Sequence, residues 1–335
     1  MAGIIDRRAF SEEKYLLIDG KIADAKRYAD GKACICATGS YGRLEASEHS
    51  DLDIFIVGLD KSPEDKISPS NKILESELSR LDEICIKADL ISACRSLGLK
   101  EFDADGQYLA HYSVSQLIGT LGKPEDDASN TFTARLLMLL EGRPLSGAEV
   151  FNKAIDEIIA SYWRDYGDHK NDFAPAFLSN DILRLWRTFC VNYEARTETT
   201  PHEKKLKRRV KNYKLKFSRL LTCYSGLLQI LYTYNSNGTV SPSDMKAICL
   251  MTPIERIESL IGSAKVASDP LSKIFDQYNR FLEVTDEPIS NLLLKFDHPE
   301  KRDELLRGSY EFADSIFASI NLIGQGSKMH RMLVV

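Results

Sequence analysis

The segment from Ala33 to Val57 constrains the fold more than any other part of the chain. Ala33 to Ala37 is a short apolar run, and Asp51 to Val57 is apolar after its two acidic residues. Runs of this length, bounded by turn residues, predict buried strands. The turn between them, Thr38 to Arg43, contains two glycines. Two strands that follow one another so closely predict a small sheet in this half of the chain.

The length and composition are typical of a globular protein with two domains. The chain has 335 residues, 43% of them hydrophobic and 28% charged, with a net charge of -5. It has no run near the roughly 20 apolar residues of a membrane span, and its first residues lack the pattern of a signal peptide. We therefore expect no membrane association.

The cysteines and histidines suggest neither disulfides nor a zinc site. Seven cysteines are scattered without a CxxC pair, and the six histidines lack zinc spacing. Cys34 and Cys36 alternate along the predicted strand and so share one face, which is a poor geometry for a disulfide. We expect buried thiols in a reducing cytoplasm.

The first 145 residues predict a mixture of helices and strands. Beyond the two strands above, the predicted elements are helices over residues 10–30, 71–97 and 131–141 and a strand over residues 107–112. Gly142 to Leu145 breaks the pattern. We therefore predict a domain boundary there, with a first domain over residues 1–145.

Residues 146–335 predict helices throughout. Ile182, Leu185, Trp186 and Phe189 begin an apolar stripe at helical spacing, with Asn180 or Asp181 as a candidate cap. The further predicted helices cover residues 203–234, 243–250, 253–263, 269–284, 286–296 and 301–323. The predicted fold class is an α/β (α+β) domain with a small mixed sheet, followed by an all-α domain.

Asp51 and Asp53 form a candidate metal site. Positions two apart on a strand project from the same side, and two carboxylates held this way repel each other. A divalent cation relieves that repulsion, and Mg²⁺ commonly takes one or two carboxylates together with phosphate oxygens of a substrate. Mn²⁺ is the expected alternative.

Gly39 and Ser40 form a candidate phosphate-binding turn. The backbone N–H groups and the Ser40 hydroxyl can hold phosphate oxygens, and a glycine lets the backbone approach them closely. Arg43 can neutralise phosphate charge. With the paired aspartates, these residues indicate a site for a nucleoside triphosphate (NTP) in which two metals about 4 Å apart assist displacement at the α-phosphate.

The motif resembles that of a known enzyme superfamily. Gly39-Ser40-Tyr41-Gly42-Arg43-Leu44-Glu45 followed by Ser50-Asp51-Leu52-Asp53 is similar to the signature of the DNA polymerase β-like nucleotidyltransferases. It is most similar to the bacterial uridylyl- and adenylyltransferases that modify nitrogen-regulatory proteins. A weaker similarity continues through Leu97-Gly98-Leu99 and Thr133 to Leu137.

The resemblance implies roles for four of these residues. It assigns Gly39 and Ser40 to triphosphate binding, and Asp51 and Asp53 to the metals. Many members of the superfamily carry a third catalytic carboxylate on a neighbouring strand. Asp105 is the candidate here, although it lies just before the predicted strand and, with Gly106, equally suits a plain turn.

Nine basic residues crowd the helix predicted over residues 203–234. They are Lys204, Lys205, Lys207, Arg208, Arg209, Lys211, Lys214, Lys216 and Arg219. This asymmetry in an acidic chain fits nucleic acid, the triphosphate, or a solvated helix face. Because no aromatic residues are interleaved on the basic faces, we favour triphosphate binding by Lys204 and Lys205 over polynucleotide binding.

The sequence thus predicts an enzyme that transfers a nucleoside monophosphate (NMP) from an NTP to a hydroxyl. The resemblance favours a protein side chain as acceptor. Synthesis of cyclic or linear oligonucleotides, extension of tRNA ends and modification of aminoglycosides stay open. A protein that binds nucleotide without turning it over is the alternative of another class.

Overall fold

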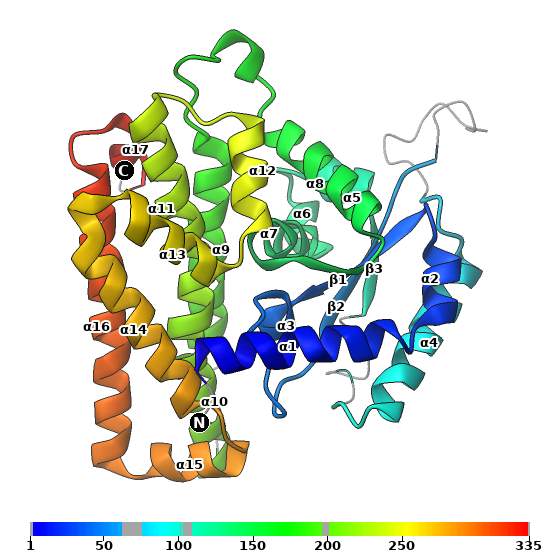
Figure 1. Ribbon diagram of the computed structural model, residues 1–335, viewed down its shortest axis with the longest axis horizontal. Coiled ribbons are helices and arrows are strands. Elements are labelled where there is room, and N and C mark those ends of the chain that lie inside the picture. The colour runs from blue at the N-terminus through cyan, green and yellow to red at the C-terminus, as the bar shows by residue number, and fades with distance from the viewer. Residues whose placement is uncertain (1–2, 62–75, 101, 103–108, 196–200, 334–335) are drawn as a thin grey trace. The chain divides into compact units, whose positions relative to one another are not determined.

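A computed structural model describes residues 3–61, 76–100, 102, 109–195 and 201–333. The chain divides into two compact units (Figure 1). One unit, the sheet unit, is Asp6–Arg164, and the other, the helical unit, is Asp165–Val335 together with Met1–Ile5. Among the described helices, none combines the length and the apolar character that a membrane crossing requires.

The sheet unit is built on a small mixed sheet, as expected, with four strands where the sequence predicted three. Its strands lie in the order β3-β2-β1-β4. They are β1 (Ala33–Thr38), β2 (Asp53–Gly58), β3 (Ala110–Ser113) and β4 (Arg143–Ser146). β1 pairs antiparallel with β2 and with β4, whereas β2 pairs parallel with β3. All six residues of β1 are buried because helices cover both faces of the sheet, which explains its uninterrupted apolar sequence.

Each face of the sheet packs against helices. Ile35, Ile54 and Ile56 join a core on one face with residues of α1 (Ile4–Asp19), α2 (Ala23–Ala29) and α4 (Arg80–Ser96). The helices α7 (Thr131–Glu141) and α8 (Ala148–Tyr162) contact the strands as well. Three short helices complete the unit: α3 (Gly39–Gly42), α5 (Val114–Gly119) and α6 (Glu125–Ala128).

The end of this unit differs from the predicted domain boundary after residue 145. Gly142 does end α7, but the residues that follow form β4, which pairs with β1. Pro144 is tolerated there because β4 is an edge strand. The next helix, α8, buries its apolar side in the sheet unit and contacts β1 and β2, so the unit extends to Arg164.

Three further elements differ from their predicted bounds. The helix predicted over residues 71–97 begins at Arg80, where the Ser79 hydroxyl accepts a hydrogen bond from the Asp82 N–H and caps it. The helix predicted over residues 10–30 is two helices, α1 and α2. The strand predicted over residues 107–112 is β3, and residues 103–108 lie outside the described part of the chain.

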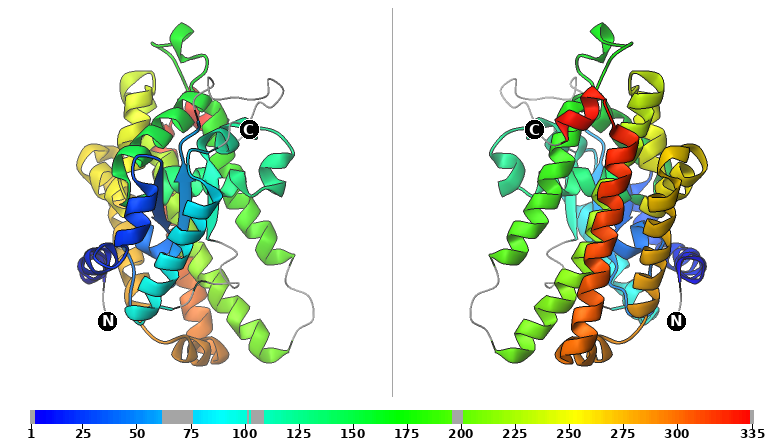
Figure 2. Two further views of the ribbon diagram at one scale, coloured as in Figure 1. Left: turned by 90° about the vertical axis from the view of Figure 1, so that its right-hand side faces the viewer. Right: turned by 90° about the vertical axis from the view of Figure 1, so that its left-hand side faces the viewer.

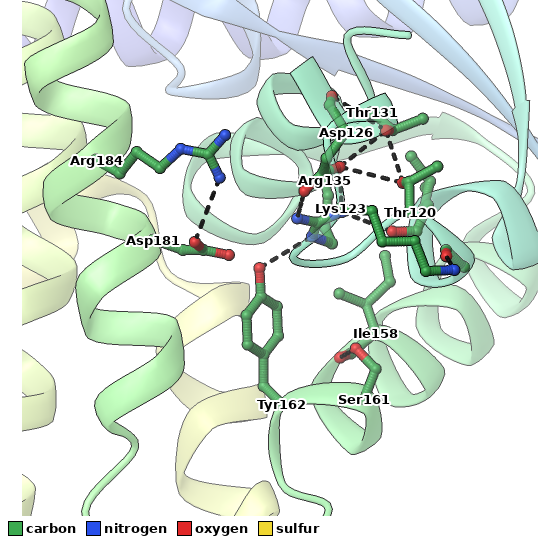
Figure 3. A network of polar contacts seen from close by, with 12 residues as sticks. Thr120, Lys123, Asp126, Thr131, Arg135, Ile158, Ser161, Tyr162, Asp181 and Arg184 are labelled. Carbon is green, nitrogen blue, oxygen red and sulfur yellow. Dashed lines mark hydrogen bonds and ion pairs between the residues drawn. The ribbon is translucent and has the colours of Figure 1, made fainter. Parts of the chain in front are cut away.

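A buried ion pair joins α6, α7 and α8 (Figure 3). Arg135 on α7 binds both carboxylate oxygens of Asp126 on α6, at 2.9 Å and 2.6 Å. It also donates from Nε to the Tyr162 hydroxyl at 2.9 Å. The hydroxyls of Thr120 and Thr131 donate to the same Asp126 oxygen, Oδ1. Because both charges are fully buried and their hydrogen bonds are satisfied, the pair fixes how these helices pack.

The described part of the helical unit contains no strand. Its main helices are α9 (Ala176–Glu194), α10 (His202–Lys214), α11 (Leu220–Asn237), α12 (Pro242–Leu250), α13 (Pro253–Ser263), α14 (Ser268–Val284), α15 (Ile289–Asp297), α16 (Pro299–Gly324) and α17 (Lys328–Met332). Figure 2 shows α16 running alongside its neighbours, and it packs against α11 and α14.

Most helix bounds in this unit agree with the predictions, with two differences. The helix predicted over residues 203–234 is α10 and α11, joined by a π-helical turn, Leu215–Arg219. Gly238 ends α11 in the left-handed conformation, with φ of 76°. The predicted caps Asn180 and Asp181 lie inside α9, which begins at Ala176.

We predict that Asp126→Asn destabilises the sheet unit by about 3–5 kcal/mol at neutral pH, because it leaves the Arg135 charge buried without a counter-charge. Burial by itself would raise the pKa of Asp126, but Arg135 and the two threonines outweigh it and hold that pKa below its usual value. The pKa of Asp126 is lower in the folded state than in the unfolded state. The stabilisation by the ionised carboxylate is therefore present above about pH 4, and it is lost as the pH falls through the folded-state pKa.

Urea unfolding of wild type and Asp126→Asn over a range of pH tests this. The difference in unfolding free energy should shrink on acidification. Glu203→Gln is the matched control, because Glu203 pairs with Lys207 on the exposed surface of α10 and its loss should leave the unfolding free energy unchanged. A difference that grows on acidification contradicts the assignment.

Candidate functional site

The predicted phosphate turn and one predicted metal ligand meet at one end of the sheet. Thr38, the last residue of β1, pairs with Asp53, the first residue of β2, and α3 begins directly after Thr38. Gly39 has φ of 64°, and a Cβ added there would collide with Oδ2 of Asp53. A side chain at this position would therefore be strained by the backbone conformation and would displace the Asp53 carboxylate, while the expected approach of phosphate to Gly39 stays a prediction.

Asp51 lies differently from the prediction. It precedes β2 instead of opening it, so strand alternation does not set the direction of its side chain. Its Oδ1 lies 3.0 Å from Nζ of Lys100, which also donates to the His49 carbonyl. The Asp51 side chain is 42% exposed and the Lys100 side chain 52% exposed. A lysine therefore supplies positive charge beside Asp51, in a pair that water screens and that is weak.

Arg43 is not placed as a phosphate ligand. It is buried, and its Nε binds Oε2 of Glu45 at 2.7 Å while its Nη1 binds Oε2 of Glu141 at 2.8 Å. Both glutamates are buried as well. A guanidinium enclosed by two carboxylates serves to fix this region of the fold, and a nucleotide-binding role of Arg43 stays a prediction.

Glu141 connects this ion-pair network to the phosphate turn. Its Oε1 accepts the Gly39 N–H at 2.9 Å, while its Oε2 holds Arg43. The first amide of the turn thus has a protein acceptor. The amides of Ser40 and Tyr41, in the first turn of α3, have no acceptor within that helix. The Ser40 amide and the half-buried Ser40 hydroxyl are the candidate donors to a ligand, whereas Tyr41 is buried.

The donor chemistry of the acidic pair fits Mg²⁺ or Mn²⁺. Asp53 is exposed, Asp51 is partly exposed, and both supply the carboxylate oxygens that these cations prefer. Within the described residues there is no group of three or more His, Cys, Asp or Glu side chains arranged to hold a metal. Asp105, the predicted third carboxylate, lies outside the described residues.

His111 occupies a structural position. It pairs with Ile56 across β3 and β2, and strand alternation places Ile56 on the face opposite that of Asp53. One ring nitrogen of His111 lies 3.1 Å from Oε2 of Glu83, and the other lies 3.1 Å from Oγ of Ser76. Both ring nitrogens therefore have partners from the protein.

Lys204 and Lys205 belong to the helical unit. Both are exposed on α10, which covers the first part of the helix predicted over residues 203–234. A nucleotide-binding role for these two lysines stays a prediction.

Sequence reasoning missed Glu141 and Lys100. Glu141 ends the apolar run Leu136 to Leu140, and an acid so placed on a buried helix indicates a buried partner. Lys100 has no comparable local signal. Its ion pair with Asp51 forms only because the chain that follows α4 folds back to lie beside Asp51.

Comparison of the chain with known protein families, with curated proteins and with solved structures finds no match. The similarity to nucleotidyltransferases therefore stays a resemblance carried by the residues around Gly39 and Asp51.

We predict that Arg43→Met costs about 3–5 kcal/mol of folding stability, because it leaves two buried carboxylates without their shared cation. Urea unfolding measures the loss. Lys100→Met, which removes an exposed partner of a carboxylate, is the control and should change stability by less than about 0.5 kcal/mol. A stable Arg43→Met protein that no longer binds triphosphate would restore the ligand role of Arg43.

Lys100→Met also tests the charge beside Asp51. Because a cation that binds the Asp51 carboxylate would have to displace Lys100, removal of Lys100 should strengthen Mn²⁺ binding by up to about fivefold, the range expected for an exposed ion pair. Calorimetric titration of the nucleotide-free protein with Mn²⁺ measures this. Weaker Mn²⁺ binding by the variant would mean that Lys100 supports the metal site instead of competing with it.

Proposed function

We propose that this chain is a metal-dependent nucleotidyltransferase that moves an NMP from an NTP to an acceptor hydroxyl. The observation that carries the proposal is the contact between the Gly39 turn and the Asp53 carboxylate at the end of β1. A phosphate held by this turn lies next to Asp53, so a cation on that carboxylate also reaches the phosphate.

Each residue of the site has a role in this proposal. The Ser40 hydroxyl and the Ser40 amide hold phosphate oxygens of the NTP. Asp51 and Asp53 hold Mg²⁺ or Mn²⁺. When bound, the metal supplies positive charge that offsets the charge of the triphosphate.

Rigidity of the turn supports transfer chemistry. Glu141 accepts the Gly39 N–H and is itself held by Arg43, and the buried surroundings of these two side chains leave them little freedom. Donors fixed before the substrate arrives need no reorganisation during the reaction. Asp105 is proposed as a third carboxylate, which would accept the proton of the acceptor hydroxyl.

The acceptor class follows from the resemblance alone. Protein-modifying uridylyl- and adenylyltransferases carry the most similar motif, so we propose a protein side-chain hydroxyl in the cytoplasm. Oligonucleotide synthesis, tRNA extension and aminoglycoside modification are the other acceptor classes. Of the features in the chain, the exposed basic residues of α10 favour a nucleic-acid acceptor or a further contact with the triphosphate.

A second candidate function is nucleotide binding without turnover. The observation that favours it is the Lys100 ammonium on the Asp51 carboxylate. A lysine that keeps this position in the nucleotide-bound protein would neutralise Asp51 without a metal.

We predict that Asp51→Ala and Asp53→Ala each abolish turnover, because neither carboxylate holds the metal alone. Incubation with labelled NTPs and Mg²⁺ or Mn²⁺ measures pyrophosphate release and label transfer. Asp24→Ala is the matched control, since Asp24 pairs with Arg27 on the exposed surface of α2. Folding should survive both changes at the site, because Asp53 is exposed and Asp51 is partly exposed, and substitutions at such positions change stability little.

Two outcomes contradict the enzymatic proposal. Wild-type turnover with unchanged metal dependence in either variant would place the chemistry elsewhere. Tight NTP binding by wild type without pyrophosphate release, over all four NTPs and both metals, would favour the binding function.

A further inference from the structure

The two partners that hold the His111 ring in the sheet unit are a carboxylate and a hydroxyl. Nδ1 of His111 lies 3.1 Å from Oε2 of Glu83, and Nε2 lies 3.1 Å from Oγ of Ser76. Glu83 belongs to α4, His111 to β3, and Ser76 precedes α4. An acid on one ring nitrogen and a hydroxyl on the other, both at hydrogen-bond distance, is the arrangement by which a histidine activates a serine as a nucleophile.

The partners of Glu83 set the tautomer of His111. Burial by itself would raise the pKa of Glu83, but Lys87 and His111 outweigh it and hold that pKa below its usual value. Lys87 pairs with Oε1 of Glu83, which leaves Oε2 for the histidine. An ionised carboxylate only accepts hydrogen bonds, so the neutral ring carries its proton on Nδ1. Nε2 is then the acceptor, and the Ser76 hydroxyl donates to it.

Gly58, the last residue of β2, makes room for this contact. A Cβ built there would collide with Oγ of Ser76 and with Nε2 of His111. Gly58 has no positive φ, so its backbone conformation does not require glycine, which is otherwise unfavourable in a strand. The space left by the missing side chain is an observation independent of the two hydrogen bonds. It lies at the opposite end of β2 from Asp53.

We propose that Ser76 is an activated nucleophile and that it catalyses hydrolysis of carboxylic esters together with His111 and Glu83. Ser76 and His111 are the catalytic residues, and Glu83 is a positioning residue that acts through His111. This is a second site, formed by described residues of the sheet unit alone. It uses neither the Gly39 turn nor a metal, so it goes beyond the proposed transfer of an NMP.

The surroundings of the three side chains suit an ester. Ser76 is partly exposed, so a substrate can reach its hydroxyl. Leu81 and Ile84, beside Glu83 in the sequence of α4, are exposed and offer apolar surface for an acyl group. The amides of Arg80 and Leu81, in the first turn of α4, have no acceptor within that helix. Both residues are exposed, and these amides are the candidate donors to the oxyanion of the reaction.

The reaction has two steps. Oγ of Ser76 bonds to the carbonyl carbon of the ester while its proton moves to Nε2 of His111, and Glu83 stabilises the resulting imidazolium. The bond from the carbonyl carbon to the alcohol oxygen then breaks, and the alcohol leaves with the proton from His111. Water attacks the acyl group on Ser76 in the second step, with His111 again as base, and releases the carboxylic acid and the free serine.

A fluorophosphonate probe tests the nucleophile in the full chain. Attack by Ser76 displaces fluoride and leaves a stable phosphonate ester, whose position mass spectrometry of the digested protein determines. Hydrolysis of p-nitrophenyl butyrate measures turnover. Both assays contain a chelator and no nucleotide, so they succeed or fail independently of the proposed transferase activity.

We expect the label on Ser76 of the wild-type protein, a result that does not depend on any variant. Ser76→Ala should lose the label and the ester hydrolysis, and His111→Gln should slow both by at least about 100-fold through loss of the base. Glu83→Gln should lower kcat by a similar factor with KM unchanged, because the carboxylate acts on the base and not on the bound ester. Ser92→Ala is the matched control, since the exposed Ser92 hydroxyl on α4 donates to the Ala88 carbonyl and contacts no histidine.

Three outcomes overturn the proposal. One is a wild-type protein that carries no label on Ser76, and another is ester hydrolysis no faster than that of Ser76→Ala. The third is a label on Ser76 that forms equally fast in His111→Gln, with circular dichroism showing that this variant is folded. The hydrogen bonds of His111 would in each case serve only to join α4 to β3.

Discussion

The buried guanidinium of Arg43 is the interaction on which the candidate site depends. It joins Glu45, just beyond the phosphate turn, to Glu141 at the end of α7, and Glu141 in turn holds the Gly39 N–H. Residues nearly a hundred positions apart in the chain thus become one rigid unit behind the turn. In a buried environment, loss of Arg43 leaves two carboxylates without their shared cation, so the support for the position of Gly39 against Asp53 depends on this guanidinium.

Charges in this protein fall into two classes by their burial. Arg43 and the Asp126–Arg135 pair are buried and hydrogen-bonded, and they fix how helices and strands pack. The Asp51–Lys100 pair is exposed, and its partners can exchange with ions in solution. A site that binds and releases a charged substrate needs exposed charges that can exchange their partners. The buried ion pairs fix the framework that carries such exposed charges.

The sequence predicted the elements of the fold better than their assembly. The helix over residues 131–141 and the helix over residues 253–263 have the predicted bounds, because apolar periodicity and helix ends are local signals. β4 was missed, since its pairing with β1 joins segments far apart in the chain and Pro144 argues against a strand. The ion pairs of Arg43 were missed for the same reason, because its second carboxylate, Glu141, comes from α7.

The sequence by itself determined the secondary structure of most of the chain, the two buried strands around a glycine turn, and the motif of Gly39, Ser40, Asp51 and Asp53. Tertiary structure alone decided which charges are buried and which stay exchangeable. That decision depends on contacts between residues distant in the chain, as Glu141 with Arg43 and Lys100 with Asp51 illustrate. Local patterns report which residues can form a helix, a strand or a turn, whereas the environment of a charge is set by the elements that pack around it.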